Sequence, residues 1–205
     1  MWNRFKQDAL RWVVPGEVAD PSVLTWMLLL QLLLRHPSLR AMAWFRLACW
    51  CKAKRIPFVV GTIHRRLFFR FGLELGGDIA GGLYIAHPVG TVINARQIGR
   101  NCSVIAGVTV GMRNEWVFPV IGDGVFIGAG ARVLGDLRVG DNAKIGANAV
   151  VLSDIPTNAT AVGVPARVIK IEGVDAAVNG HRAHVYPVAP QTNGQVNHSL
   201  SSLHA

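Results

Sequence analysis

Between residues 121 and 151 an aliphatic side chain returns at every sixth position. A period of six fits neither an α-helix, with about 3.6 residues per turn, nor a single strand, with a period of two. It fits a chain that winds around three flat faces with one short strand on each, as in a parallel β-helix. A small residue after several of these positions would let the backbone turn each corner. The repeating positions are Ile121, Ile127, Val133, Val139, Ile145 and Val151, with the same phase expected upstream at Val92, Ile98, Val104 and Val110.

The six-residue phase breaks once, because Val110 and Ile121 are eleven residues apart. The segment 111–120 must therefore leave the coil as a loop. Insertions in a solenoid usually lie on its binding face. The loop carries Arg113, Trp116 and Phe118, which either form a wall of a site beside the solenoid or pack back on the coil as ordinary surface residues.

The three cysteines, Cys49, Cys51 and Cys102, form neither a disulfide framework nor a complete set of metal ligands. We expect reduced thiols in a cytosolic protein and no bound metal. Cys102 falls within a hexad, so packing in the interior or on a face of the coil is expected for it. At 205 residues the chain can bury a core without disulfides.

Basic residues are concentrated near the N-terminus. Residues 1–71 hold twelve Lys or Arg and three Asp or Glu, whereas residues 72–205 hold nine of each kind. This surplus could meet an anionic membrane or a phosphorylated carrier, or form a solvated helical face. No nucleic-acid recognition motif accompanies it. The apolar run 23–34 is shorter than the roughly 20 residues that a membrane span needs, so we expect a buried helix, with peripheral attachment to the inner membrane surface left open.

Composition divides the chain into three parts. Residues 1–71 are predicted to be helical, with a helix that begins at Asp20-Pro21-Ser22 and ends near His36, and two more over about 38–54 and 58–71. Residues 72–171 form the predicted solenoid, closed by a final strand after Gly163. Residues 172–205 are a polar tail without periodicity, for which flexibility is expected.

Several stretches resemble the serine acetyltransferase-like branch of the hexapeptide-repeat acyltransferases. They are GLYIAHPVGTVI (82–93), VIAGVTVG (104–111), IGAGARVLGD (127–136), IGANAVVLSDIP (145–156) and VGVPARVIK (162–170). The resemblance implies a left-handed β-helix that forms a homotrimer, or a hexamer through the helical domain. It also implies active sites between neighbouring prisms, with acetyl-CoA as donor along a coil edge.

His87 is the only histidine between residues 65 and 180, and it occupies the position of the family's catalytic histidine. Acyl transfer to an alcohol needs a base, and a neutral imidazole suits that role near pH 7. The family also places a carboxylate one coil earlier to orient the base. Glu74 lies nearest to that position and is preferred to Asp78, although either can be a solvated turn charge.

For the donor, the resemblance implies that backbone groups of four small residues bind the pantetheine amides. Arg167 and Lys170 would meet its phosphates. The small residues can also be simple corner residues of the coil. They are Gly128, Ala129, Gly146 and Ala147.

The acceptor is predicted from where the chain departs from the serine enzymes. Ala86 replaces their Asp before the histidine, and Val117-Phe118-Pro119 replaces an Arg-His-Pro run. Serine is a zwitterion, so a site for it needs paired charged groups, and these two departures remove several of them. The segments HPVG and VIN (92–94) also resemble polysaccharide and colanic-acid-type acetyltransferases. We therefore expect the acceptor to be a sugar or polysaccharide hydroxyl. Serine is the alternative, supported by Asp20-Pro21, and a non-catalytic trimeric scaffold is a third. Candidate acceptor contacts are Asp20, Arg113, Trp116 and Phe118. A γ-carbonic anhydrase is excluded, because one coil histidine cannot supply three zinc ligands.

Overall fold

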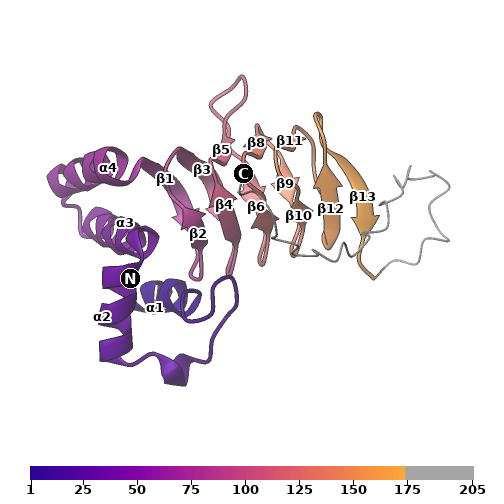
Figure 1. Ribbon diagram of the computed structural model, residues 1–205. Coiled ribbons are helices and arrows are strands. Elements are labelled where there is room, and N and C mark those ends of the chain that lie inside the picture. Colours follow the sequence, from indigo (N-terminus) through magenta and orange to yellow (C-terminus); the bar gives the residue numbers. More distant parts are fainter. Residues whose placement is uncertain (174–205) are drawn as a thin grey trace, which may run out of the picture.

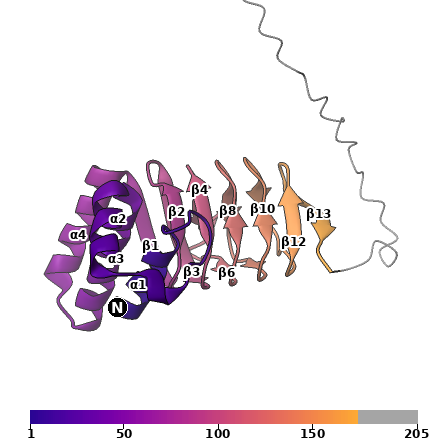
Figure 2. The same ribbon diagram turned by 60° about the horizontal axis from the view of Figure 1, so that its bottom comes forward.

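The computed structural model describes residues 1–173. Helices occupy the first part of the chain and short strands the rest (Figure 1). The helices gather at one end of the strand stack, and the last strand lies at the other end (Figure 2). The helices are α1 (Trp2–Leu10), α2 (Trp26–Arg35), α3 (Pro37–Ala53) and α4 (Pro57–Phe71), with a short 3-10 turn η1 (Pro21–Val23) before α2.

The strands form a parallel β-solenoid, as predicted. One face holds the start of β3 with β5, β8 and β11, and a second holds the end of β3 with β6 and β9. The third face holds β2, β4, β7, β10 and β12, closed by antiparallel β13. The strands are β1 (Leu73–Ile79), β2 (Tyr84–His87), β3 (Thr91–Ile98), β4 (Ser103–Ala106), β5 (Thr109–Gly111), β6 (Val120–Ile121), β7 (Phe126–Ile127), β8 (Arg132–Leu134), β9 (Arg138–Val139), β10 (Lys144–Ile145), β11 (Val150–Val151), β12 (Ala159–Val162) and β13 (Arg167–Ile171).

A regular turn of the solenoid takes 18 residues, because Phe126 pairs with Lys144 in the next coil and the other two faces shift by the same number. Three hexads per turn explain the period of six. Every predicted interior position from Ile98 to Val151 is buried. Val92 is the exception: it is half-buried, and Ile93 fills the interior instead. The reason is that β3 runs through a corner as one eight-residue strand, so its interior residues Ile93 and Ile98 are five apart.

The predicted loop stands between β5 and β6 and projects from the solenoid (Figure 1). Its coil is longer than the regular one, since Ser103 pairs with Phe126, 23 residues further on.

The glycines that follow interior residues serve a purpose other than the predicted one. Gly122, Gly128, Gly140 and Gly146 are absent from the residues with positive φ, so they do not turn the corners. A Cβ atom at Gly128 would lie 2.7 Å from the Ala147 nitrogen in the next coil. These residues are small because successive coils stack too closely there for a side chain. The corners turn instead through other residues with positive φ, such as Asn101, Gly124 and Asn142.

The helices close the open end of the solenoid. Met42 and Phe45 from α3, and Leu67 from α4, share one buried cluster with the interior of the first coils. The secondary structure changes at Gly72, where the sequence places a boundary, and Gly72 ends α4 with φ of 60°. Packing nevertheless crosses this point, and the division into domains stays a prediction. The predicted tail, 172–205, lies outside the described residues apart from Glu172 and Gly173.

The first predicted helix begins later than expected. Asp20 caps only the short turn η1, where its side chain accepts a hydrogen bond from the Ser22 N–H at 2.7 Å. The long apolar helix α2 is capped by Thr25, whose hydroxyl accepts from the Leu28 N–H. Among the helices of residues 1–173, none combines the length and the apolar character needed to cross a bilayer.

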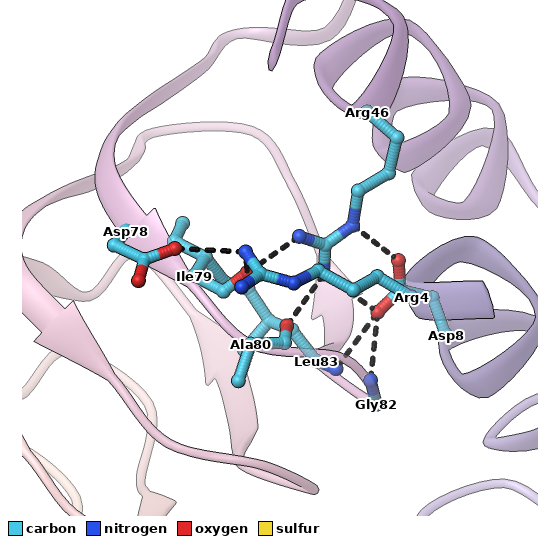
Figure 3. Close-up of polar contacts among 8 residues, drawn as sticks. All are labelled: Arg4, Asp8, Arg46, Asp78, Ile79, Ala80, Gly82 and Leu83. Atoms are coloured by element: carbon cyan, nitrogen blue, oxygen red, sulfur yellow. Dashed lines mark hydrogen bonds and ion pairs between the residues drawn. The ribbon is translucent and has the colours of Figure 1, made fainter. Parts of the chain in front are cut away.

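A buried ion pair fastens the helices to the solenoid (Figure 3). Arg46 of α3 contacts both carboxylate oxygens of Asp8 from α1, at 2.8 and 3.0 Å, and both side chains are almost fully buried. Arg46 also donates to the carbonyl oxygens of Ile79 and Ala80, while Asp8 accepts from the N–H groups of Gly82 and Leu83. Burial raises the pKa of the Asp8 carboxyl, and these hydrogen bonds act in the opposite direction.

We expect single replacements in this pair to cost much more stability than the loss of the pair as a whole. Asp8→Leu or Arg46→Met leaves one buried charge without its partner and should lower the free energy of unfolding by about 3–5 kcal/mol. The double variant should lose less than the sum of the two, because no charge is left unpaired. Urea unfolding followed by circular dichroism measures each value.

The matched control is Arg4→Met, which removes the exposed ion pair with Asp78 at the same junction. Exposed pairs contribute about 0–1 kcal/mol. A loss from Arg4→Met equal to that from Arg46→Met would contradict the special weight given to the buried pair.

Cys102 packs inside the solenoid, which is one of the two predicted placements, and its thiol donates to the Gly122 carbonyl oxygen. Burial raises the pKa of Cys102 to about 11, so little thiolate is present near neutral pH. We expect iodoacetamide to modify exposed Cys49 in the folded protein and Cys102 only after unfolding, as measured by mass spectrometry of the peptides. Equal rates at the two thiols would show that the coil opens there.

Candidate active site

His87 is the last residue of β2, and its side chain is exposed. Strand alternation would turn it inward with Ile85, which is fully buried. The strand ends at His87, however, and the chain enters a corner that includes Gly90, whose φ is 72°. The corner frees the imidazole from the interior and leaves it at an edge of the prism.

Thr91, which the sequence reasoning missed, fixes the backbone at this corner. It is fully buried, and its hydroxyl donates to the His87 carbonyl oxygen at 3.2 Å. The same oxygen atom of Thr91 accepts from the Gly107 N–H in the next coil at 3.1 Å. The available signal was a hydroxyl residue among aliphatic ones, four positions after the histidine.

His87 stands at the head of a column of small residues. It pairs with Ala106, and the registers of β4, β7 and β10 carry the column on through Ala129 and Ala147. We call this line of four residues the His87 edge.

The structure separates the four small residues that the sequence treated alike. The N–H groups of Gly128 and Gly146 are engaged, since they donate to the carbonyl oxygens of Ile145 and Ala161. Within residues 1–173, the N–H groups of Ala129 and Ala147 have no acceptor. The edge therefore presents open donors at the two alanines, and the two glycines serve coil stacking.

Register also separates the two predicted phosphate contacts. Val162 stacks against Gly146 from the next coil, and Arg167 of β13 pairs with Val162. Arg167 therefore stands at the far end of the His87 edge. Five steps of strand spacing lead from β2 to β13. At about 4.8 Å each, they separate His87 and Arg167 by about 24 Å along the prism. Lys170 pairs with Thr160 nearer the opposite edge of that face, and its Nζ lies 3.8 Å from a Glu172 carboxylate oxygen.

The two candidate orienting carboxylates also differ in position. Glu74 lies opposite Val92, just past the His87 corner, and accepts a hydrogen bond from the Asn94 amide at 2.7 Å. Asp78 pairs with Arg4 at 2.7 Å and lies opposite Gln97, on the next face. In the described part of the chain, neither carboxylate is hydrogen-bonded to the His87 ring.

The inserted loop lies at the other edge of the face that begins after His87. Trp116 is 80% exposed, and its ring meets that of Phe118 edge-to-face at 5.7 Å. Arg113 is exposed and lies against Gly135. A single copy therefore does not bring the loop and His87 together. Asp20 is exposed, and its hydrogen bonds from Ser22 lower the pKa of its carboxyl.

Within residues 1–173, no three His, Cys, Asp or Glu side chains lie close enough to hold a metal ion.

The family model described as "Bacterial transferase hexapeptide (six repeats)" matches residues 118–153. The serine acetyltransferase of Helicobacter pylori (strain J99) is 40% identical over 145 residues, which make up 68% of this chain and 85% of the relative. That of Synechococcus elongatus is 36% identical over 151 residues, 71% of this chain, and the match spans 62% of its length.

Solved structures agree with these relatives. The serine acetyltransferase of Neisseria gonorrhoeae in complex with serine superposes with a TM-score of 0.66 and 31% identity, covering 81% of this chain and 68% of that one. A serine acetyltransferase in complex with CoA superposes with a TM-score of 0.63 and 28% identity, covering 82% of this chain and 68% of that one. The expected resemblance to polysaccharide-type enzymes finds no support among these proteins. The chain belongs to the serine acetyltransferase family, an acyltransferase family built on hexapeptide repeats.

Proposed function

We propose that this protein is an acetyl-CoA-dependent O-acetyltransferase whose acceptor is L-serine. The observation that carries the proposal is the exposed imidazole of His87 at the head of an edge with open N–H donors. The names of the relatives favour serine over the sugar hydroxyl that the sequence suggested. Transfer to a sugar hydroxyl is the alternative, and a screen of acceptors distinguishes the two.

In the proposed reaction, His87 takes the proton of the acceptor hydroxyl as its oxygen attacks the thioester carbonyl of acetyl-CoA. The tetrahedral intermediate collapses with cleavage of the C–S bond. The imidazolium returns the proton to the departing sulfur, so the products are the O-acetyl ester and CoA thiol. Thr91 supports this step by holding the His87 backbone against the next coil. No covalent enzyme intermediate is required.

The donor is proposed to lie along the His87 edge. The open N–H groups of Ala129 and Ala147 suit the carbonyl oxygens of a pantetheine arm, which would lie parallel to the prism axis. Arg167, at the far end of the same edge, carries the charge and the fork of donors that phosphate groups prefer. Lys170 is the weaker candidate, because it sits beside Glu172.

The acceptor is proposed to bind between two copies, in a homotrimer. The loop with Arg113, Trp116 and Phe118 stands at the opposite edge of the face from His87, so a neighbouring copy would have to supply it. Arg113 offers a cation for the serine carboxylate. Asp20 offers an anion for the ammonium group, from an exposed position at the turn η1.

We expect His87→Ala to lower the rate of CoA release with L-serine by about 10²–10⁴, the usual contribution of a general base. A thiol-release assay on the purified protein measures it, with circular dichroism to confirm folding. The same assay with sugars and lipid-linked glycans tests the acceptor. Turnover with a glycan and none with serine would overturn the serine assignment, and turnover unchanged by His87→Ala would refute the base.

The two carboxylates near the first coil can be separated by a matched pair of variants. We expect Glu74→Gln to lower kcat by about tenfold or more, because a carboxylate that steadies the imidazolium acts on the chemical step. Asp78→Asn should leave kcat within about twofold, since Asp78 is paired with Arg4 in an exposed contact of small energetic weight. The opposite ranking in steady-state kinetics would assign the orienting role to Asp78.

A further inference from the structure

The outward side of α4 is apolar and basic at the same time. Among residues 58–71 of this helix, only Ile63, Leu67 and Phe71 are buried. Phe58 and Phe69, at the two ends of an outward stripe, are 87% and 78% exposed. We call the outward side the α4 face; its residues are Phe58, Thr62, Arg65, Arg66, Phe69 and Arg70, and the last five line a shallow hollow.

The charge on this part of the chain is of one sign. Residues 21–73 contain nine Lys or Arg and no Asp or Glu. Of these nine, only Arg46 forms an ion pair within residues 1–173. On the α4 face, Arg66 lies over the Trp44 ring at 5.0 Å and Arg70 over the Phe71 ring at 5.7 Å. The guanidinium groups are thus held by aromatic rings and are not neutralised by carboxylates.

We infer that the α4 face docks on the surface of a bilayer that contains anionic lipids. Arginine forks bind lipid phosphates, and exposed phenylalanine rings enter the boundary between headgroups and acyl chains. A second copy of this chain fits the face less well, because it would bring two uncompensated basic surfaces together.

The position of α4 in the fold permits this contact. It lies in the group of helices at the end of the solenoid remote from β13 (Figures 1 and 2). The His87 edge runs from β2 toward β13, away from the docked end. A bilayer on the α4 face therefore leaves the donor edge open to solution.

Co-sedimentation of the full chain with lipid vesicles tests the inference. We expect the protein to sediment with vesicles of phosphatidylcholine mixed with phosphatidylglycerol, and not with vesicles of phosphatidylcholine alone. Added salt should weaken the binding, because part of it is electrostatic.

Two variants separate the two contributions. Phe58→Ser/Phe69→Ser keeps the charge and should lower the partition coefficient by about 100-fold, since two exposed rings no longer bury apolar area. Arg65→Gln/Arg66→Gln/Arg70→Gln should abolish the preference for anionic vesicles. The matched control is Arg96→Gln/Arg100→Gln/Arg138→Gln, which removes the same charge from exposed positions of the solenoid and should bind as the parent does. Thiol release by each variant verifies its fold.

Several outcomes would overturn the inference. One is failure of the parent protein to bind anionic vesicles, and another is equal weakening by the solenoid control. In a third outcome, the parent protein does not bind vesicles, and replacing Phe58 and Phe69 changes the oligomeric state measured by size-exclusion chromatography. That result would make the α4 face an interface between copies.

Discussion

The buried contact between Asp8 and Arg46 determines how the helices meet the solenoid. It joins α1 to α3 and binds both to the backbone between Ile79 and Leu83. That backbone leads directly into β2, which ends at His87. The catalytic candidate is therefore placed by a chain of contacts that starts in the helices, although the helices contribute no residue to the His87 edge. The two charges are compatible with burial only because backbone donors and acceptors complete their hydrogen bonding.

Much of the solenoid could be predicted because its interior is narrow and admits aliphatic side chains at fixed intervals. For that reason the predicted interior positions from Ile98 to Val151 are all buried. Val92 was assigned wrongly because the period describes separate strands, whereas β3 continues through a corner. The corner residues could not be separated from the stacking residues either, since both are small, and only the φ angles distinguish Asn142 and Gly124 from Gly128.

The candidate site was harder to predict than the fold, because its parts depend on register. His87 was visible as a lone histidine at a break in the repeat. The difference between Ala129 and Gly128 follows from which N–H groups the next coil uses. Arg167 and Lys170 look alike in sequence, but β13 is antiparallel and places them toward opposite edges of one face. The ion pair of Asp8 with Arg46 spans 38 residues, and no local pattern announces it.

The geometry of one face explains why a single copy is insufficient for the proposed reaction. The face that follows His87 takes about six residues, so the His87 edge and the loop are separated by about 20 Å at 3.3 Å per residue. A side chain such as that of Arg113 cannot span this distance within its own prism. In the proposed homotrimer, unlike edges of neighbouring prisms would come together, and the loop of one copy would meet His87 of another. On this argument a monomeric variant that keeps its fold would retain an exposed His87 and the open donors of Ala129 and Ala147, yet it would lack the wall that selects the acceptor.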